Sequence, residues 1–179
     1  MSKERDLIMP GIPVPGGVWA ELGSGSGIFT LALLEVAGPQ IELYSVDRDA
    51  KALEKQRRAV SARYPQSRVT YLHTDFSRPI GLPALDGILM ANALHFTKFD
   101  QQQAVLQRIC TYLKPAGGKL IIVEYEARRG NPWVPYPVDF ESFQYLAGEA
   151  GLSEVRRLAM IPSSFMGSMY SAIGVRHPR

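Results

Sequence analysis

The sequence predicts an α/β protein built on an open, mostly parallel sheet with helices on both faces. Short apolar segments of strand length alternate with longer segments of helical periodicity from about residue 18 to residue 125. Glycine and proline punctuate the junctions, as in the Lys-Pro-Ala-Gly-Gly sequence at residues 114–118. Strand–helix–strand units of this kind join parallel strands by right-handed crossovers.

Length and composition suit a single domain over residues 1–179, with a hydrophobic content of 46% and a charged content of 21%. No apolar run reaches the roughly 18 residues of a membrane span, and the first residues lack the apolar core of a signal peptide. We therefore expect a cytoplasmic protein without a membrane partner. The single cysteine, Cys110, excludes an internal disulfide. The net charge of +3 is too weak an excess to identify a nucleic-acid partner.

The first strand runs from Val18 to Leu22 and enters the sequence Glu-Leu-Gly-Ser-Gly-Ser-Gly at residues 21–27. Residues 1–17 before it are rich in proline and glycine, so we expect an irregular segment there. Glycines permit positive φ and close approach of a ligand, and the unpaired amides of the following helix face the same crevice. A nucleotide-like ligand fits such a corner.

The later elements follow from apolar periodicity and from breaker residues. Asp49 is a plausible N-cap, and the continuous apolar segment at residues 85–91 is typical of a strand buried on both faces. Residues 127–138 form a long loop with aromatic residues. The other expected strands cover residues 41–46, 69–73, 119–125, 152–159 and 168–176, and the expected helices cover about 26–36, 49–64, 100–113 and 139–150.

Polar residues follow the carboxyl ends of the strands, where an open α/β sheet binds its ligand. Asp47 ends the second strand, and its carboxylate can accept hydrogen bonds from both hydroxyls of a ribose. The alternative is that Asp47 caps the next helix, although Asp49 is better placed for that role. Asp75 follows the third strand, and Asn92 and His95 follow the fourth.

The glycine spacing separates two classes of nucleotide-binding protein. A dinucleotide fingerprint, G-x-G-x-x-G, would place its third glycine at Ile28. Here Glu21, Gly23, Gly25 and Gly27 instead match (D/E)-x-G-x-G-x-G. With this motif, residues 18–126 resemble the class I S-adenosylmethionine-dependent methyltransferases. The resemblance implies a Rossmann-like, doubly wound sheet of seven strands with an antiparallel C-terminal hairpin, and S-adenosylmethionine as the cofactor.

The resemblance also assigns roles to individual residues. It implies that Asp75 accepts the adenine amino group, that the backbone amide of Phe76 reaches a ring nitrogen, and that the segment beginning at Asn92 lines the methionine part. Asp75 and Phe76 could instead be a turn and a core residue, and Arg48 either stacks near the adenine or stays solvated. The expected cofactor-binding residues are Glu21, Gly23, Ser24, Gly25, Gly27, Asp47, Arg48, Thr74, Asp75, Phe76 and Asn92.

The chain departs from the family in two respects. It lacks most of the N-terminal region that covers the substrate in relatives, so the site is open, is covered by residues 127–138, or is completed by a second subunit in a homodimer. Asn92 is followed by Ala93 rather than by the Pro-Pro-Tyr/Phe that accompanies methylation of amide and exocyclic amine nitrogens.

The sulfonium methyl group is already activated, so the main task is in-line positioning of a nucleophile with water excluded. A base is needed only if the acceptor must lose a proton. His95 is the leading candidate, with a structural role as its alternative; Glu124, Tyr125 and Tyr136 are weaker candidates. Three dispersed histidines do not indicate a metal site.

The favoured function is methyl transfer to a small, partly apolar or aromatic molecule, with Trp133 and Tyr136 as a wall of its site. Methylation of RNA or protein is an alternative that an open site and the Arg128-Arg129 pair would favour. Other classes are a nicotinamide-dependent oxidoreductase, which the glycine spacing and the lack of a Tyr-x-x-x-Lys pair oppose, and a non-catalytic nucleotide-binding module.

Overall fold

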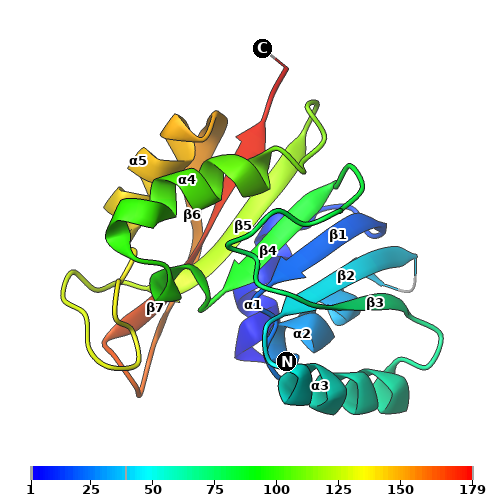
Figure 1. Cartoon of the computed structure of the whole chain (residues 1–179). Helices are drawn as coiled ribbons and strands as arrows, with labels where there is room; N and C mark the ends of the chain where they lie inside the picture. The colour runs from blue at the N-terminus through cyan, green and yellow to red at the C-terminus, as the bar shows by residue number, and fades with distance from the viewer. Residues whose placement is uncertain (1, 39, 179) are drawn as a thin grey trace.

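The computed structural model describes residues 2–38 and 40–178 and shows a seven-stranded sheet in the order β3-β2-β1-β4-β5-β7-β6 (Figure 1). Strands β1 to β5 pair in parallel, whereas β7 is antiparallel to both β5 and β6. The predicted Rossmann-like, doubly wound sheet with an antiparallel C-terminal hairpin is therefore confirmed. The strands are β1 (Gly17–Leu22), β2 (Ile41–Asp47), β3 (Arg68–His73), β4 (Gly87–Ala91), β5 (Gly118–Tyr125), β6 (Leu152–Pro162) and β7 (Ser168–Arg176).

Helices cover both faces of this sheet and bury a hydrophobic core on each (Figure 1). Side chains of α4 and α5 form the core on one face, and side chains of α1, α2 and α3 form the core on the other. The helices are α1 (Lys3–Ile8), α2 (Ile28–Ala37), α3 (Ala50–Arg63), α4 (Phe99–Cys110) and α5 (Phe140–Glu149), with 3₁₀ turns η1 (Met9–Gly11) and η2 (Leu94–Phe96). Within the described parts of the chain, every helix is too short or too polar to cross a lipid bilayer.

The chain builds the sheet outward from β1 to β3 and then returns to place β4 on the other side of β1. This reversal of strand order lies between β1 and β4, and it opens a crevice beyond their carboxyl ends. The glycine sequence after β1 and the segment after β4 both enter that crevice. The fold thus brings together two polar segments that are about 70 residues apart in the chain.

The expectation of an irregular segment over residues 1–17 is wrong for residues 3–11, which form α1 and η1; Met1 lies outside the described residues. Ser2 caps α1 by accepting a hydrogen bond from the Arg5 amide at 3.2 Å. Leu7 and Ile8 are buried in the core beneath the sheet. The first proline stands only at Pro10, so no breaker interrupts the helix, and burial of two large apolar residues stabilises a helix too short to form alone.

Gly87 of β4 shows how closely the central strands pack. It is paired with Trp19 of β1, and a Cβ atom at this position would overlap the indole ring of Trp19. We predict that Gly87→Ala lowers the free energy of unfolding by about 1–3 kcal/mol, because the buried ring must move out of its place. Urea denaturation measures this. Gly81→Ala is the matched control, since a Cβ there meets no described atom within 4 Å. Equal losses in the two variants would contradict the prediction.

Candidate active site

A cavity of about 750 Å³ lies at the carboxyl ends of β1 to β4, where the strand order reverses. It is the position at which an open α/β sheet binds its ligand. Among the predicted cofactor-binding residues, those that line it are Glu21, Gly23, Ser24, Gly25, Asp47, Arg48, Thr74, Asp75, Phe76 and Asn92. The fold therefore gathers these residues around one space; their individual roles stay predictions.

The three glycines after β1 have different surroundings, although all have positive φ. No described atom lies within 4 Å of a Cβ built on Gly25, so this glycine is open to a ligand. A Cβ on Gly23 would come within 2.6 Å of the Ala93 Cβ atom. Gly27 does not line the cavity, and a Cβ there would overlap the side chain of Gln56. The structure thus explains Gly27 by packing against α3 and gives it no place in the cavity.

A buried polar network supports this glycine loop from below. Glu21 is 1% exposed and accepts a hydrogen bond from the Thr30 hydroxyl, which in turn accepts one from the Gln56 amide group. The Gln56 Oε1 atom lies 3.0 Å from the Ser45 hydroxyl and 3.3 Å from the Ser24 hydroxyl, both of which can donate to it. These side chains belong to β1, the glycine loop, α2, β2 and α3, so one network joins every element that surrounds the loop.

Burial governs the ionisation of Glu21. Desolvation raises the pKa of this carboxyl from 4.5 to about 8, against the opposing hydrogen bond from Thr30 and with a smaller contribution from the nearby Asp47. Glu21 is therefore mainly uncharged at pH 7. Burying this carboxyl group costs less free energy in the uncharged form than in the charged form.

Asp47 stands between the glycine loop and α3. Its Oδ2 atom accepts a hydrogen bond from the Gly25 amide at 2.7 Å, and its Oδ1 atom accepts one from the Asp49 amide at 2.8 Å. The cap of α3 is Asp49, which accepts from the Lys51 and Ala52 amides at 2.9 and 3.2 Å. Asp47 is thus free of the capping role and holds its carboxylate beside Gly25, with lone pairs left for further donors.

Asp75 and Phe76 occupy the start of the segment between β3 and β4. Burial alone would raise the pKa of Asp75, but hydrogen bonds from Ser77 and the charges of Arg48 and Arg78 outweigh it and keep the pKa below its usual range. Asp75 is consequently an anion at neutral pH. Phe76 lies beside Gly23 and lines the cavity, and its partly buried ring also packs against the core on the face of α4 and α5.

Asn92 combines an unusual backbone conformation with an unpaired side-chain oxygen. It has a φ of 51°, in the left-handed region that side-chain-bearing residues rarely adopt. Its amide donates to the Val123 carbonyl oxygen at 2.8 Å, but its buried Oδ1 atom has no hydrogen-bond partner among the described residues. An unpaired buried acceptor costs about 1–3 kcal/mol, which a ligand with a donor group would recover.

His95 does not face the crevice, and this expectation is wrong. The side chain is 2% exposed, is not among those that line the cavity, and places Nδ1 2.6 Å from Oε2 of the buried Glu124. The same carboxylate accepts hydrogen bonds from the Leu94 and His95 amides at 2.9 and 3.3 Å. Glu124 therefore draws the imidazole inward and fixes η2, so that the next residue, Phe96, lines the cavity instead.

Trp133 and Tyr136 also lie outside the cavity lining. Trp133 is 66% exposed and packs edge-on against Phe165, with ring centroids 5.9 Å apart. Tyr136 packs against Phe99, with centroids 5.3 Å apart, and its amide donates to the His95 carbonyl oxygen. The predicted wall is therefore displaced, since this loop packs on α4 and on the β6–β7 turn rather than over the crevice.

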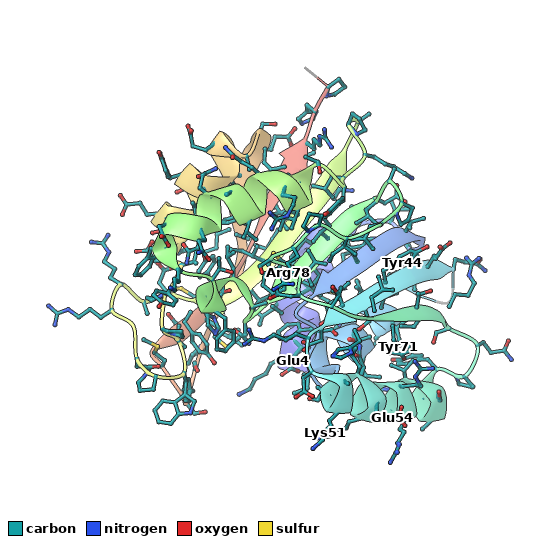
Figure 2. The ribbon with its side chains drawn as sticks, in the orientation of Figure 1. Glu4, Tyr44, Lys51, Glu54, Tyr71 and Arg78 are labelled. Carbon is teal, nitrogen blue, oxygen red and sulfur yellow. The ribbon has the colours of Figure 1, made fainter. Side chains whose placement is uncertain are left out.

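Two segments that sequence analysis did not assign to the site complete the cavity. One is α1, through Lys3, Glu4 and Leu7; Figure 2 labels Glu4. The other is the β6–β7 hairpin, through residues 161–164 and Met169. In the sequence, only the capping residue Ser2 and the apolar pair Leu7-Ile8 indicate α1. No motif indicates that the β6–β7 hairpin lines the cavity. The remaining lining residues not predicted as cofactor contacts are Ser26, Ile28, Phe29, Ser77, Ala91, Ala93, Phe96, Thr97, Lys98 and Gln101.

This sheet, with its glycine loop and acidic strand ends, is that of a class I S-adenosylmethionine-dependent methyltransferase. A family model described as "Methyltransferase domain" matches residues 20–117, more than half of the chain, and the protein belongs to this family. The chain therefore contains a methyltransferase domain, and this match supports neither the nicotinamide-dependent oxidoreductase nor the non-catalytic module. The predicted class is confirmed.

One curated protein is similar in sequence over about half of this chain. The chain is 32% identical over 91 residues to a ribosomal RNA small subunit methyltransferase H of Sorangium cellulosum, a match that covers 48% of this chain and 28% of that protein. The chain thus aligns with less than a third of this curated relative.

Solved structures share the fold at low sequence identity. The YcgJ protein of Bacillus subtilis superposes with a TM-score of 0.76 at 12% identity, covering 98% of this chain and 99% of that one. Magnesium protoporphyrin IX methyltransferase of Synechocystis, solved with bound S-adenosylmethionine, gives 0.74 at 18% identity and covers 95% and 74% of the two chains. These likenesses bear on the fold alone.

The burial of Glu21 makes stability depend on pH in a defined direction. Between pH 4.5 and about 8 the unfolded chain has lost this proton while the folded chain retains it, so stability falls as pH rises. We predict that Glu21→Gln removes this fall, which is worth about 1.4 kcal/mol per pH unit within the window. Urea denaturation at pH 5, 6, 7 and 8 measures the difference.

The exposed Glu54 of α3 offers the control, since Glu54→Gln leaves the buried network untouched. The gap, taken as the free energy of unfolding of Glu21→Gln minus that of the natural protein, should rise steadily from pH 5 to pH 8. A gap that stays constant across this range would contradict a protonated Glu21 in the folded state.

Proposed function

We propose that this chain binds S-adenosylmethionine in the cavity at the end of β1 to β4 and transfers its methyl group to a small, partly apolar or aromatic molecule. One observation carries the proposal: Asp47, Asp75 and Asn92, whose buried Oδ1 atom has no partner among the described residues, line the same cavity as the open Gly25. All three side chains present hydrogen-bond acceptors. They suit a ligand whose polar groups are mostly donors.

S-adenosylmethionine fits this set of acceptors. Asp47, at the end of β2, would accept from the two ribose hydroxyls, and the anionic Asp75 would accept from the adenine amino group. The Asn92 oxygen, at the end of β4, would accept from the ammonium group of the methionine part. The absence of a described atom near the Gly25 Cβ position leaves room for the ligand to approach the backbone.

When bound, this cofactor supplies a methyl group on a positively charged sulfur, which needs no further activation. The contribution of the chain is then to align the acceptor and to exclude water. The apolar side chains of Leu7, Phe29, Ile161 and Met169 line the cavity and suit the second task. His95 lies outside the lining, so its proposed part is to hold η2 through Glu124 rather than to take a proton from the acceptor.

Two exposed apolar side chains of the cavity lining support an apolar acceptor. They are Ile28 and Phe96, which are 59% and 53% exposed. The β6–β7 turn also carries Phe165, which follows the lining residue Ser164. The Phe165 ring contacts those of Tyr125 and Trp133, with centroids 5.7 and 5.9 Å away. Exposed apolar side chains lining a cavity favour a ligand that covers them.

Methylation of RNA is the second candidate, favoured by the name of the curated relative, a ribosomal RNA methyltransferase. The Arg128-Arg129 pair gives it less support than the sequence suggested. The Arg128 guanidinium lies 3.3 Å from an Asp139 carboxylate oxygen and 2.9 Å from one of Glu141, so its charge is already paired within the chain.

The cofactor assignment can be tested by calorimetric titration. We expect S-adenosylmethionine and S-adenosylhomocysteine to bind and NADH not to bind. Asp47→Asn should weaken both by about 10- to 100-fold, because one charge-assisted hydrogen bond to a ribose contributes about 1.5–3 kcal/mol. Asp49→Asn is the matched control, since it retains the α3 cap and lies outside the cavity. Tight NADH binding without the sulfur ligands would reject the assignment.

The acceptor class requires a separate test. Transfer from labelled S-adenosylmethionine should appear on small aromatic molecules, and Phe96→Ala should lower kcat/KM for them by about tenfold or more through lost apolar contact. The affinity of the Phe96→Ala variant for S-adenosylhomocysteine should differ less than twofold from that of the natural protein. Tyr145→Ala, on the exposed face of α5, is the control. Label found on RNA or protein and on no small molecule would overturn this part of the proposal.

A further inference from the structure

The segment between β3 and β4, residues 74–86, carries Asp75 and Phe76 but has little regular structure of its own. We name it the adenine loop, on the proposed function. Local hydrogen bonds shape its first turn: the Ser77 amide donates to Asp75 Oδ1 at 2.8 Å, and the Arg78 amide donates to the Asp75 carbonyl oxygen at 3.0 Å. Figure 2 labels Arg78 on this loop. Such bonds set the shape of the turn but not its distance from the cavity.

Its position is set from outside, by the C-terminal part of α4 and the turn that follows. An Arg108 guanidinium nitrogen donates to the Ser77 carbonyl oxygen, and the Tyr112 hydroxyl oxygen accepts from the Ile80 amide at 3.0 Å. Arg108 and Tyr112 are four residues apart, which places them on one face of a helical turn. One face of this segment therefore contacts the adenine loop at two successive points.

The end of the loop is held by the same segment. The Leu85 amide donates to the Tyr112 carbonyl oxygen at 2.8 Å, and the Lys114 amide donates to the Leu85 carbonyl oxygen at 2.8 Å. These main-chain bonds would form with any side chain at position 112. The Arg108 guanidinium and the Tyr112 hydroxyl add contacts that depend on residue type near the start of the loop, and Lys114 Nζ adds one at its end by donating to Asp86 Oδ1 at 2.6 Å.

The position of the Arg108 side chain leaves one of its polar atoms without a partner among the described residues. The side chain is partly buried, its Nε atom is buried without a hydrogen-bond partner among the described residues, and no carboxylate of that part of the chain forms an ion pair with it. A buried N–H group without a hydrogen-bond partner is destabilising. The contact this guanidinium makes is with Ser77, which lines the cavity two residues after Asp75.

We propose that Arg108 and Tyr112 are positioning residues for recognition of the adenine base: from the end of α4 and the turn after it, they hold the adenine loop so that Asp75 meets the exocyclic amino group. The inference rests on the proposed function, which puts adenine at Asp75. Neither residue lines the cavity, so both act through the loop and not by contact with the ligand. Their loss should therefore reduce discrimination between bases more than it reduces binding of the rest of the ligand.

The test compares two ligands that differ at one group of the base. S-adenosylhomocysteine carries the amino group, and S-inosylhomocysteine carries a carbonyl oxygen in its place, which an anionic Asp75 disfavours. Calorimetry should show that Tyr112→Phe and Arg108→Met each weaken S-adenosylhomocysteine about 5- to 10-fold and S-inosylhomocysteine less than 2-fold. The adenine preference should fall by the same factor as the first affinity, and Asp75→Asn should remove any further effect of either change.

Matched controls are Tyr145→Phe on α5 and Arg156→Met on β6, both on exposed side chains away from the loop. Thermal unfolding separates loss of folding from loss of recognition. If Arg108→Met does not fold, Tyr112→Phe carries the test, since it keeps the ring and removes only the accepting oxygen. An unchanged ratio of the two affinities, with S-adenosylhomocysteine still bound by the natural protein, overturns this inference alone. Absence of binding by the natural protein overturns the proposed function with it.

Discussion

The buried hydrogen-bond network of Glu21, Thr30 and Gln56 is the constraint on which the candidate site depends. The glycine loop has few side chains with which to fix itself, since three of its residues are glycines with positive φ and its Ser24 hydroxyl depends on Gln56 and Ser45 for its partners. The network fixes it from the elements that surround it: Glu21 in β1, Thr30 in α2 and Gln56 in α3. Because every partner is buried, no water can replace a missing group, and removal of one member would leave the others unpaired.

The part of the site made by local sequence was predictable. Strand ends and the glycine spacing are properties of short segments, so Gly25, Asp47 and Asp75 could be placed before the structure was known. The parallel pairing of the first five strands followed from the strand–helix alternation for the same reason. Asp49 was also identified correctly as the cap of α3, because capping depends on neighbouring residues only.

Features that depend on tertiary burial were not predictable. Whether His95 points into the crevice or away from it is decided by Glu124, which is 29 residues away in the chain and whose position required the sheet register. In the same way α1 is too short to be stable alone, and burial of Leu7 and Ile8 against the sheet makes it form. The displacement of Trp133 and Tyr136 has the same origin, since their partners Phe165 and Phe99 lie in other elements.

Two separate parts of the chain line the cavity. Part of its lining comes from the glycine loop and the carboxyl ends of β1 to β4, and part comes from α1 and from the β6–β7 hairpin. Residues 169–176 of β7 pair with β5, while residues 161–164 and Met169 of the hairpin line the cavity. Insertions, deletions or exchanges in the turn can therefore alter which molecules enter while the glycine loop stays intact. On the proposed function, acceptor preference can therefore change through residues 163–167 at this edge of the sheet.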